Sequence, residues 1–121
     1  MANQPNKGFK RIYNALGYSL AGFKATFENE EAFRQELILV ALTLPVAFII
    51  FDSPWQWALI WFCAMMILLV EILNSAIESI VDRVGSERHE LSGRAKDMGS
   101  AAVSVILLTY AGLWFILLFD R

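Results

Sequence analysis

The sequence has few of the residues from which many common functional sites are built. It contains one cysteine, Cys63, and one histidine, His89, so no disulfide can form within the chain. Cys63 lies in an apolar run without a pattern of metal ligands around it, which argues against a metal role. The G-x-x-x-x-G-K-[ST] motif of P-loop proteins is absent, as is the glycine-rich loop of soluble kinases. A net charge of −2 gives no support to nucleic-acid binding.

Charge is also absent from three long segments, and these segments dominate the chain. Residues 37–51, 53–70 and 98–119 contain no Asp, Glu, Lys or Arg. Apolar residues make up 57% of the 121 residues, more than the roughly 45–50% of a typical soluble domain. A helix needs about 20 apolar residues to cross a bilayer. The sequence therefore predicts an all-α integral membrane protein, in one domain, with transmembrane helices over residues 32–51, 55–84 and 98–119.

An amphipathic helix is predicted before the first span, over residues 6–27. Its apolar side chains recur at helical spacing: Phe9, Ile12, Tyr13, Leu16, Leu20, Phe23 and Phe27. Basic residues occupy the other side, as is typical of a helix that lies on an anionic membrane surface. Packing on a soluble core is the alternative, and we favour the surface helix because no such core is in sight. Gly17 and Gly22 weaken the helix and would allow two shorter ones.

The distribution of basic residues predicts the orientation in the membrane. Lys and Arg are concentrated in the N-terminal segment and in a polar loop predicted at residues 85–97, while the turn at 52–54 has none. By the positive-inside rule, the N-terminus and the 85–97 loop are cytoplasmic and the C-terminus lies outside. No apolar core directly follows the first basic residues, so the N-terminus is not a signal peptide.

One face of the second span is acidic. At about 100° per residue, a stripe about 100° wide contains Glu71, Asn74, Ser75, Glu78 and Asp82. A charged side chain in hydrocarbon costs at least about 2.5 kcal/mol, so such residues usually have a function. The outer halves of all three spans are apolar, which argues against a channel or pump and favours a site at the cytoplasmic edge.

The chemistry of the stripe suits phosphoryl transfer. Carboxylate and amide oxygens bind Mg²⁺ together with substrate phosphates, and nearby basic residues such as Arg11, Arg34, Arg94 and Lys96 would hold the phosphates. A desolvated carboxylate is a stronger proton acceptor than one in water, which suits a general base acting on a hydroxyl. The residues alone are equally consistent with acids that pair with Arg34, Arg83 or Lys96 to lock the helices together. His89, alone in a charged loop, is interpreted as a solvated residue.

Two long segments carry a resemblance to a known family. EILNSAIESIVDR at 71–83 and GSERHELSGRAKDMGSAA at 85–102 resemble the prokaryotic diacylglycerol kinase family, and residues 8–36 extend the similarity. The resemblance implies ATP-dependent phosphorylation of the diacylglycerol hydroxyl to phosphatidic acid at the bacterial inner membrane, with Mg²⁺ as cofactor. It also implies a homotrimer whose active sites are shared between subunits. A polyprenol (undecaprenol) kinase and a non-enzymatic membrane scaffold are the alternatives.

The resemblance also implies roles for individual residues. The general base falls on Glu71, with Asn74 beside it, and the metal ligands fall on Glu30 and Glu78, which also contact the nucleotide. Further nucleotide contacts fall on Tyr18, Glu87, Arg88, His89, Lys96 and Asp97. The lipid substrate and the wall of its site involve Arg11, Arg34, Glu36, Glu71 and Ser100. Asp82 receives no role, and we expect it to pair with a nearby base.

Overall fold

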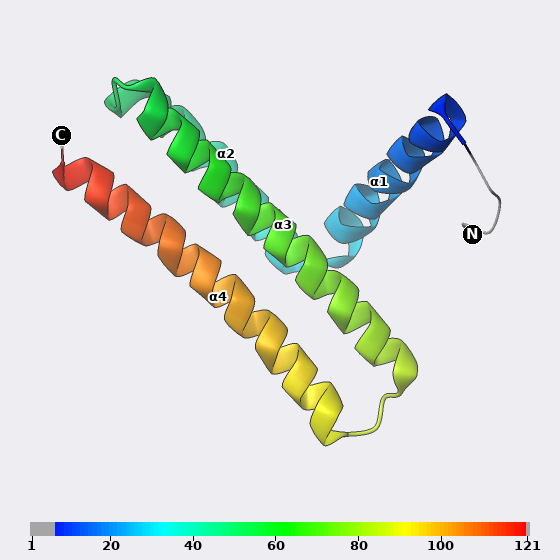
Figure 1. Ribbon diagram of the computed structural model, residues 1–121. Coiled ribbons are helices and arrows are strands. Elements are labelled where there is room, and N and C mark those ends of the chain that lie inside the picture. Colours follow the sequence, from blue (N-terminus) through cyan, green and yellow to red (C-terminus); the bar gives the residue numbers. More distant parts are fainter. Residues whose placement is uncertain (1–6, 121) are drawn as a thin grey trace.

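A computed structural model describes residues 7–120 of the chain, and this part is helical throughout, without strands. Its helices are α1 (Phe9–Asn29), α2 (Glu31–Ile50), α3 (Pro54–Val84) and α4 (Glu90–Phe119) (Figure 1). Helices α2, α3 and α4 are each long and apolar enough to cross a membrane. The all-α membrane architecture expected from the sequence is thus confirmed.

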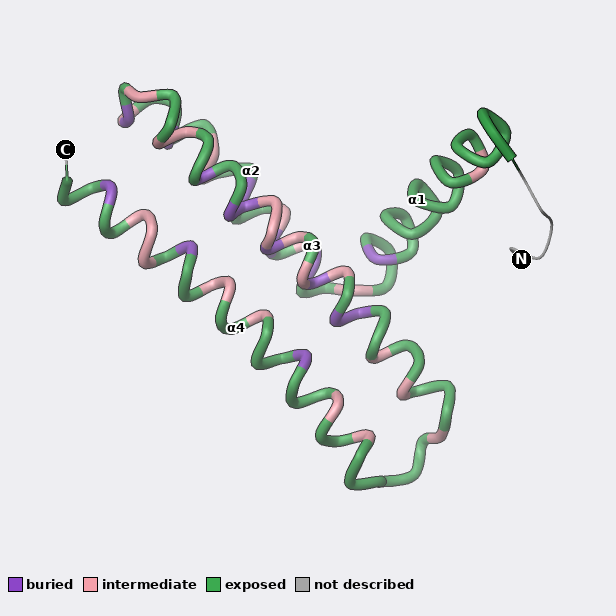
Figure 2. The backbone as a smooth tube through the Cα atoms, viewed as in Figure 1, coloured by how far each residue is buried: buried purple, intermediate pink, exposed green. Residues whose placement is uncertain are grey.

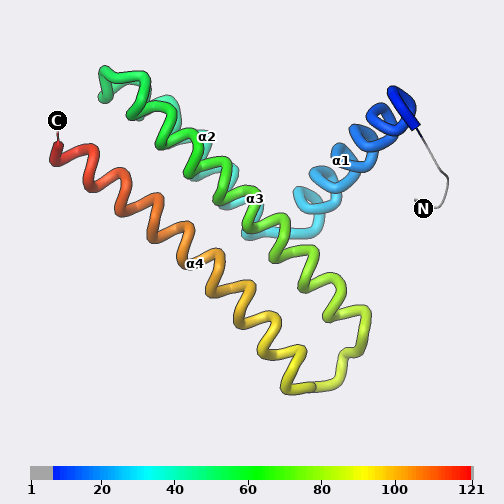
Figure 3. Tube along the Cα trace, in the orientation of Figure 1, coloured from blue at the N-terminus to red at the C-terminus, as the bar shows by residue number. Residues whose placement is uncertain are grey.

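The three long helices run side by side in alternating directions, with α3 packed against both α2 and α4 (Figure 1). The C-terminal end of α4 lies near the turn between α2 and α3, whereas the α3–α4 connection lies at the other end of these helices (Figure 3). Helix α1 turns away from this set and contacts it only near its own C-terminal end. The fold therefore has one end where α1, the start of α2, the end of α3 and the start of α4 gather.

The start of α4 differs from the sequence expectation. A loop was expected over 85–97, but α4 already begins at Glu90, so Lys96 and Asp97 are helical. Charge density marks where a span leaves hydrocarbon, and a helix can continue past that boundary into water. At 1.5 Å per residue, the 30 residues of α4 extend about 45 Å, well beyond a bilayer core of about 30 Å.

Helix α1 is continuous from Phe9 through both internal glycines to Asn29. The expected start at residue 6 lies outside the described residues. Gly8 precedes the helix with a positive φ of 65°, a conformation that favours glycine. Of the α1 side chains, Thr26 alone is buried, and the aromatic residues of the apolar face are exposed. That face is therefore available to contact a membrane or another chain.

The apolar core lies between α2, α3 and α4, and α3 supplies its centre. Ile60, Ala64 and Ile67 are fully buried at successive turns of α3, and the buried positions of α3 lie in its middle part, from Ile60 to Ser75 (Figure 2). Helix α2 continues through Pro45 without interruption. Tyr110 and Thr43 link α4 to α2 through hydroxyls 2.6 Å apart. These contacts fix α3 relative to its neighbours and so place its acidic face.

Candidate active site

Four buried polar side chains lie on α3 and on the facing start of α2, and we call them the polar cluster: Glu36 of α2, and Glu71, Asn74 and Ser75 of α3. Glu71 is only 3% exposed and is the most enclosed of the four. Its carboxylate lies near that of Glu36 on α2. The structure thus brings together the predicted general base and two of its predicted neighbours, Asn74 and Glu36, inside the helix packing.

Asn74 connects the polar cluster to Glu78 and to α4. Its Nδ2 donates a hydrogen bond to Glu78 Oε1 over 3.2 Å, one helical turn further along α3. Its Oδ1 is buried without a hydrogen-bond donor and lies against the backbone of Gly99. The amide is therefore held between a carboxylate on its own helix and the facing helix.

Glu30 occupies the junction between α1 and α2 and faces the acidic side of α3. Its backbone is extended (φ −118°, ψ 106°), which separates the two helices. Burial raises the pKa of Glu30, and the nearby carboxylates of Glu78 and Asp82 raise it further, while Arg34 lowers it. The predicted metal ligands Glu30 and Glu78 thus lie in the same acidic region of one chain, on separate elements.

This carboxylate pair fits a divalent cation. The negative charges of Glu30 and Glu78 repel each other, and a bound cation would reduce this repulsion. Within the described residues, no three Asp, Glu, His or Cys side chains are close enough to hold a cation alone. Mg²⁺ commonly uses one or two carboxylates and takes its other ligands from water and substrate phosphates. The donor set therefore suits a cation that arrives with a nucleotide.

Arg34 is engaged with the end of α1. Its Nη1 donates to the backbone oxygens of Phe27 and Glu28, over 2.6 and 3.2 Å. A helix C-terminus has carbonyls without intrahelical partners. A cation there also interacts favourably with the negative end of the helix dipole. The side chain that was expected near the lipid substrate thus holds the corner between α1 and α2, next to Glu30.

A pocket of about 490 Å³ lies at the end of α3, over the connection to α4. Its lining includes four of the predicted nucleotide contacts: Glu87, Arg88, His89 and Lys96. Lys96 Nζ lies 2.6 Å from Asp82 Oδ1, which joins α4 to α3 across the pocket. The expectation that Asp82 pairs with a nearby base is confirmed.

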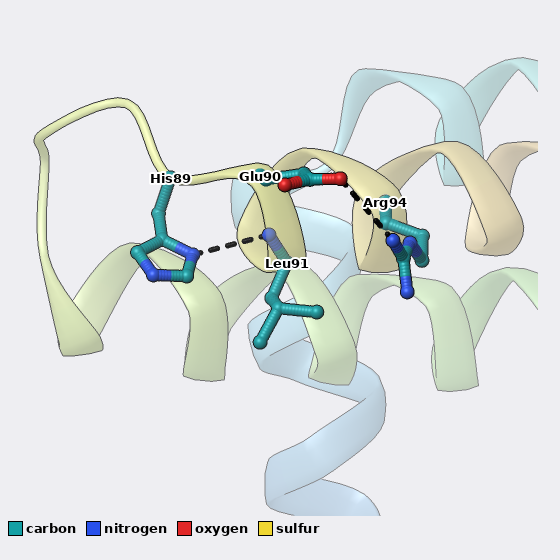
Figure 4. A network of polar contacts seen from close by, with 4 residues as sticks. All are labelled: His89, Glu90, Leu91 and Arg94. Carbon is teal, nitrogen blue, oxygen red and sulfur yellow. Dashed lines mark hydrogen bonds and ion pairs between the residues drawn. The ribbon is translucent and has the colours of Figure 1, made fainter.

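His89 also begins α4, a role that the sequence interpretation missed. Its Nδ1 accepts a hydrogen bond from the Leu91 backbone N–H over 3.1 Å, so His89 is the N-cap (Figure 4). Glu90 and Arg94 form an ion pair of 3.3 Å across the first turn. Ser, Thr, Asp and Asn are the usual N-caps, so the sequence offered no strong signal for a helix start at this position.

Other predicted site residues are not brought to the polar cluster. Tyr18 and Arg11 are exposed on α1, and Asp97 and Ser100 are exposed on α4. Asp97 lines a second hollow on α4, which does not include Lys96. A single chain therefore assembles only part of the predicted site.

Two residues of the site carried little or no signal in the sequence. Ser75 lay within the predicted stripe, but no role was assigned to it. It is buried, and both Ser75 and Glu30 line a groove of about 290 Å³ between α1 and α3. Gly99 is a small residue near the start of the third span, and the sequence indicated no role for it in the site. Its contact with Asn74 depends on how α3 and α4 pack, which no local pattern reveals.

Three apolar spanning helices, with buried acids and a pocket of charged residues towards one end, define the molecule as an integral membrane protein with a polar site at the end of its spans. The profile of the prokaryotic diacylglycerol kinase family matches residues 17–118. The chain belongs to this family, as the sequence motifs indicated.

Relatives with the curated name diacylglycerol kinase match over most of their length. The protein of Escherichia coli K12 is 50% identical over 121 residues, which are 100% of this chain and 98% of that protein. The Pseudomonas aeruginosa PAO1 protein is 53% identical over 107 residues, 88% of this chain and 87% of its own length. The Haemophilus influenzae Rd protein is 42% identical over 112 residues, or 93% and 95% of the two chains.

Proposed function

We propose that the chain transfers the γ-phosphoryl group of ATP to the hydroxyl of diacylglycerol and so forms phosphatidic acid for phospholipid metabolism and lipid recycling. The observation that carries this proposal is the placement of Glu71. It is 3% exposed between apolar helices, while Glu30, Glu78 and the charged pocket that contains Arg88 and Lys96 follow towards the end of α3. A base within the apolar layer suits a lipid hydroxyl, and acids and cations nearer water suit a nucleotide.

Glu71 is the proposed general base. Its carboxylate accepts the proton of the lipid hydroxyl while the hydroxyl oxygen forms a bond to the γ-phosphorus and the bond to the leaving ADP oxygen breaks. Phosphoryl transfer depends mainly on in-line positioning and on stabilisation of charge. Asn74 and Glu36 border Glu71 in the polar cluster, and we assign to them the orientation of its carboxylate.

Glu30 and Glu78 are the proposed ligands of Mg²⁺. The bound ion would neutralise charge on the phosphate oxygens. Glu78 follows Glu71 by seven positions, which is about 10 Å along the helix axis at 1.5 Å per residue. A phosphate chain can fit between the base and the metal ligand at this separation. Arg88 and Lys96, which line the pocket at the end of α3, contribute positive charge for the nucleotide, with Tyr18 as a further contact.

We further propose a homotrimer in the bacterial inner membrane, with the N-terminus cytoplasmic and the C-terminus outside. The basic residues at the α1 end and the α3–α4 connection support this orientation. Apolar side chains on the outer faces of α2 and α4 are exposed in the single chain, which leaves room for both lipid and neighbouring subunits. Asp97 and Ser100, which lie away from the polar cluster, would reach a neighbour's site.

The activity is tested with purified protein in detergent, diacylglycerol, ATP and Mg²⁺. Glu71→Gln should lower the rate of phosphatidate formation by about 10²–10⁴-fold, the usual contribution of a general base, while insertion and assembly persist. Glu31→Gln, an exposed acid at the start of α2, serves as the matched control and should retain activity.

Two outcomes would contradict the proposal. If the wild-type protein makes no phosphatidate but phosphorylates a polyprenol offered side by side, the lipid substrate is the polyprenol. If neither lipid is phosphorylated and Glu71→Gln changes only the thermal stability, the acids act as structural residues of a membrane scaffold.

A further inference from the structure

We propose that Gly99 is a positioning residue whose lack of a side chain orients Asn74 and, through it, the carboxylate of Glu78. The proposal rests on the function proposed above, in which Glu78 holds the cation. Gly99 lies on α4 and has no functional group of its own, so any influence on the site acts through its neighbour.

The first step is the contact between Gly99 and Asn74. Gly99 is buried, and a Cβ added to it would overlap Asn74 Oδ1 and lie 3.1 Å from Asn74 Cγ. Real Cβ atoms do not approach an oxygen that closely, so any larger residue at 99 displaces the amide. Asn74 is itself 8% exposed and packed between helices, which leaves it little free space to move into.

The second step is the link from Asn74 to Glu78. Within residues 7–120, the Asn74 side chain makes a single hydrogen bond, from its Nδ2 to Glu78 Oε1. If the amide rotates or shifts, that bond lengthens or breaks, and Glu78 loses the donor that fixes one of its oxygens. Residues that hold metal ligands in place commonly control metal affinity although they do not touch the ion.

The other glycines of α4 show that this contact is particular to Gly99. Gly93 and Gly112 lie on the same helix, and a Cβ added to either has no heavy atom within 4 Å. Glycine inside a helix is less favourable than alanine, so alanine at Gly112 adds a methyl group without a clash. Gly112→Ala is therefore the matched control for Gly99→Ala.

The experiment measures cation binding without turnover. Mn²⁺ affinity is determined by electron paramagnetic resonance on the purified full-length protein in detergent, with a non-hydrolysable ATP analogue present. We expect Gly99→Ala to weaken Mn²⁺ binding on the order of 10-fold or more, and Gly112→Ala to leave it unchanged. Asn74→Ala should weaken binding similarly, and adding Gly99→Ala to it should have no further effect.

A second measurement isolates the contact itself. In metal-free protein, Gly99→Ala should lower the thermal transition temperature in the wild-type background but not in the Asn74→Ala background, because the obstructing amide is gone. Unchanged Mn²⁺ affinity in Gly99→Ala, or additive effects of the two substitutions, would overturn the proposal. The thermal comparison of the single and double variants needs neither metal nor lipid. It therefore tests the contact between Gly99 and Asn74 even if the wild-type protein makes no phosphatidate and the proposed function is wrong.

Discussion

The acidic residues of α3 differ in their surroundings, and those differences separate their chemistry. Glu71 is enclosed beside Glu36, Glu78 is half-buried and bonded to Asn74, and Asp82 is exposed and paired with Lys96. One stripe in the sequence thus comprises an enclosed carboxylate, a carboxylate that is hydrogen-bonded to an amide and a carboxylate in an ion pair. The environment of each side chain, rather than its type, decides among these.

Glu30 should destabilise the metal-free protein at neutral pH. Burial and the carboxylates of Glu78 and Asp82 raise its pKa above the ordinary value of 4.5, so the folded state holds the proton to a higher pH than the unfolded state. Stability is therefore lost as pH rises from the unfolded pKa through the folded pKa. Glu30→Gln should raise the transition temperature at pH values above this window. The gain should shrink as the pH falls through the window and vanish below the unfolded pKa of about 4.5.

The measurement is thermal unfolding of wild-type and Glu30→Gln protein in detergent with a chelator, over a series of pH values. Glu31→Gln removes the exposed neighbouring acid and should show no comparable pH-dependent gain. An equal gain for Glu30→Gln at every pH would mean that charge on Glu30 is not the cause.

At the scale of helices, the ends matter most for the site. Helix α4 begins at Glu90 because His89 caps it and Glu90 pairs with Arg94. Lys96, which was expected in a loop, therefore lies on a helix. The corner between α1 and α2 is held by Arg34 on the last carbonyls of α1. Both ends place charged residues next to the acidic face of α3.

Arg34→Met should loosen the corner between α1 and α2. It removes two hydrogen bonds from a charged donor to carbonyls, and we expect a loss of about 1 kcal/mol of stability for this partly exposed site. Hydrogen exchange of the backbone amides over residues 27–31 should become faster, since these amides lie at the junction. The middle of α4, far from this corner, provides the internal control.

Arg34→Lys separates charge from geometry. Lysine keeps the positive charge but lacks the planar fork of guanidinium donors, so it should restore exchange rates only partly. Full recovery with lysine would show that charge near Glu30 is what counts, and unchanged exchange in both variants would refute the role of Arg34 at the corner.

For the whole molecule, the distribution of polar residues points to more than one chain per site. The polar cluster and the charged pocket at the end of α3 lie within one chain, whereas Asp97 is exposed on α4 and lines a separate hollow. If Asp97 and Glu71 serve one reaction, as the motif match implies, neighbouring subunits must supply them to each other. A closed oligomer of identical chains provides this geometry repeatedly.

Mixing two inactive variants tests shared sites. Glu71→Gln and Asp97→Asn proteins, unfolded and reassembled together, should recover about a quarter of wild-type activity, because an intact Glu71 meets an intact Asp97 in about a quarter of random interfaces. Each variant reassembled alone is the control and should stay inactive. A mixture that remains inactive would place both residues of a site on the same chain.

The sequence by itself determined the class of molecule and much of the site. Long uncharged runs predict transmembrane spans because the bilayer core contains no water to solvate charged side chains. Helical periodicity placed five polar residues on one face: Glu71, Asn74, Ser75, Glu78 and Asp82. The motif match added Glu30, which lies outside any periodic pattern. These properties depend on residues near one another in the chain.

Only the tertiary structure decided which of these groups meet and what they do there. The contact of Gly99 with Asn74, the engagement of Arg34 with the end of α1 and the pairing of Asp82 with Lys96 depend on how separate segments pack. The start of α4 depends on a histidine cap that composition does not reveal. Contacts between distant residues follow from helix packing and desolvation, and these act on the folded chain as a whole.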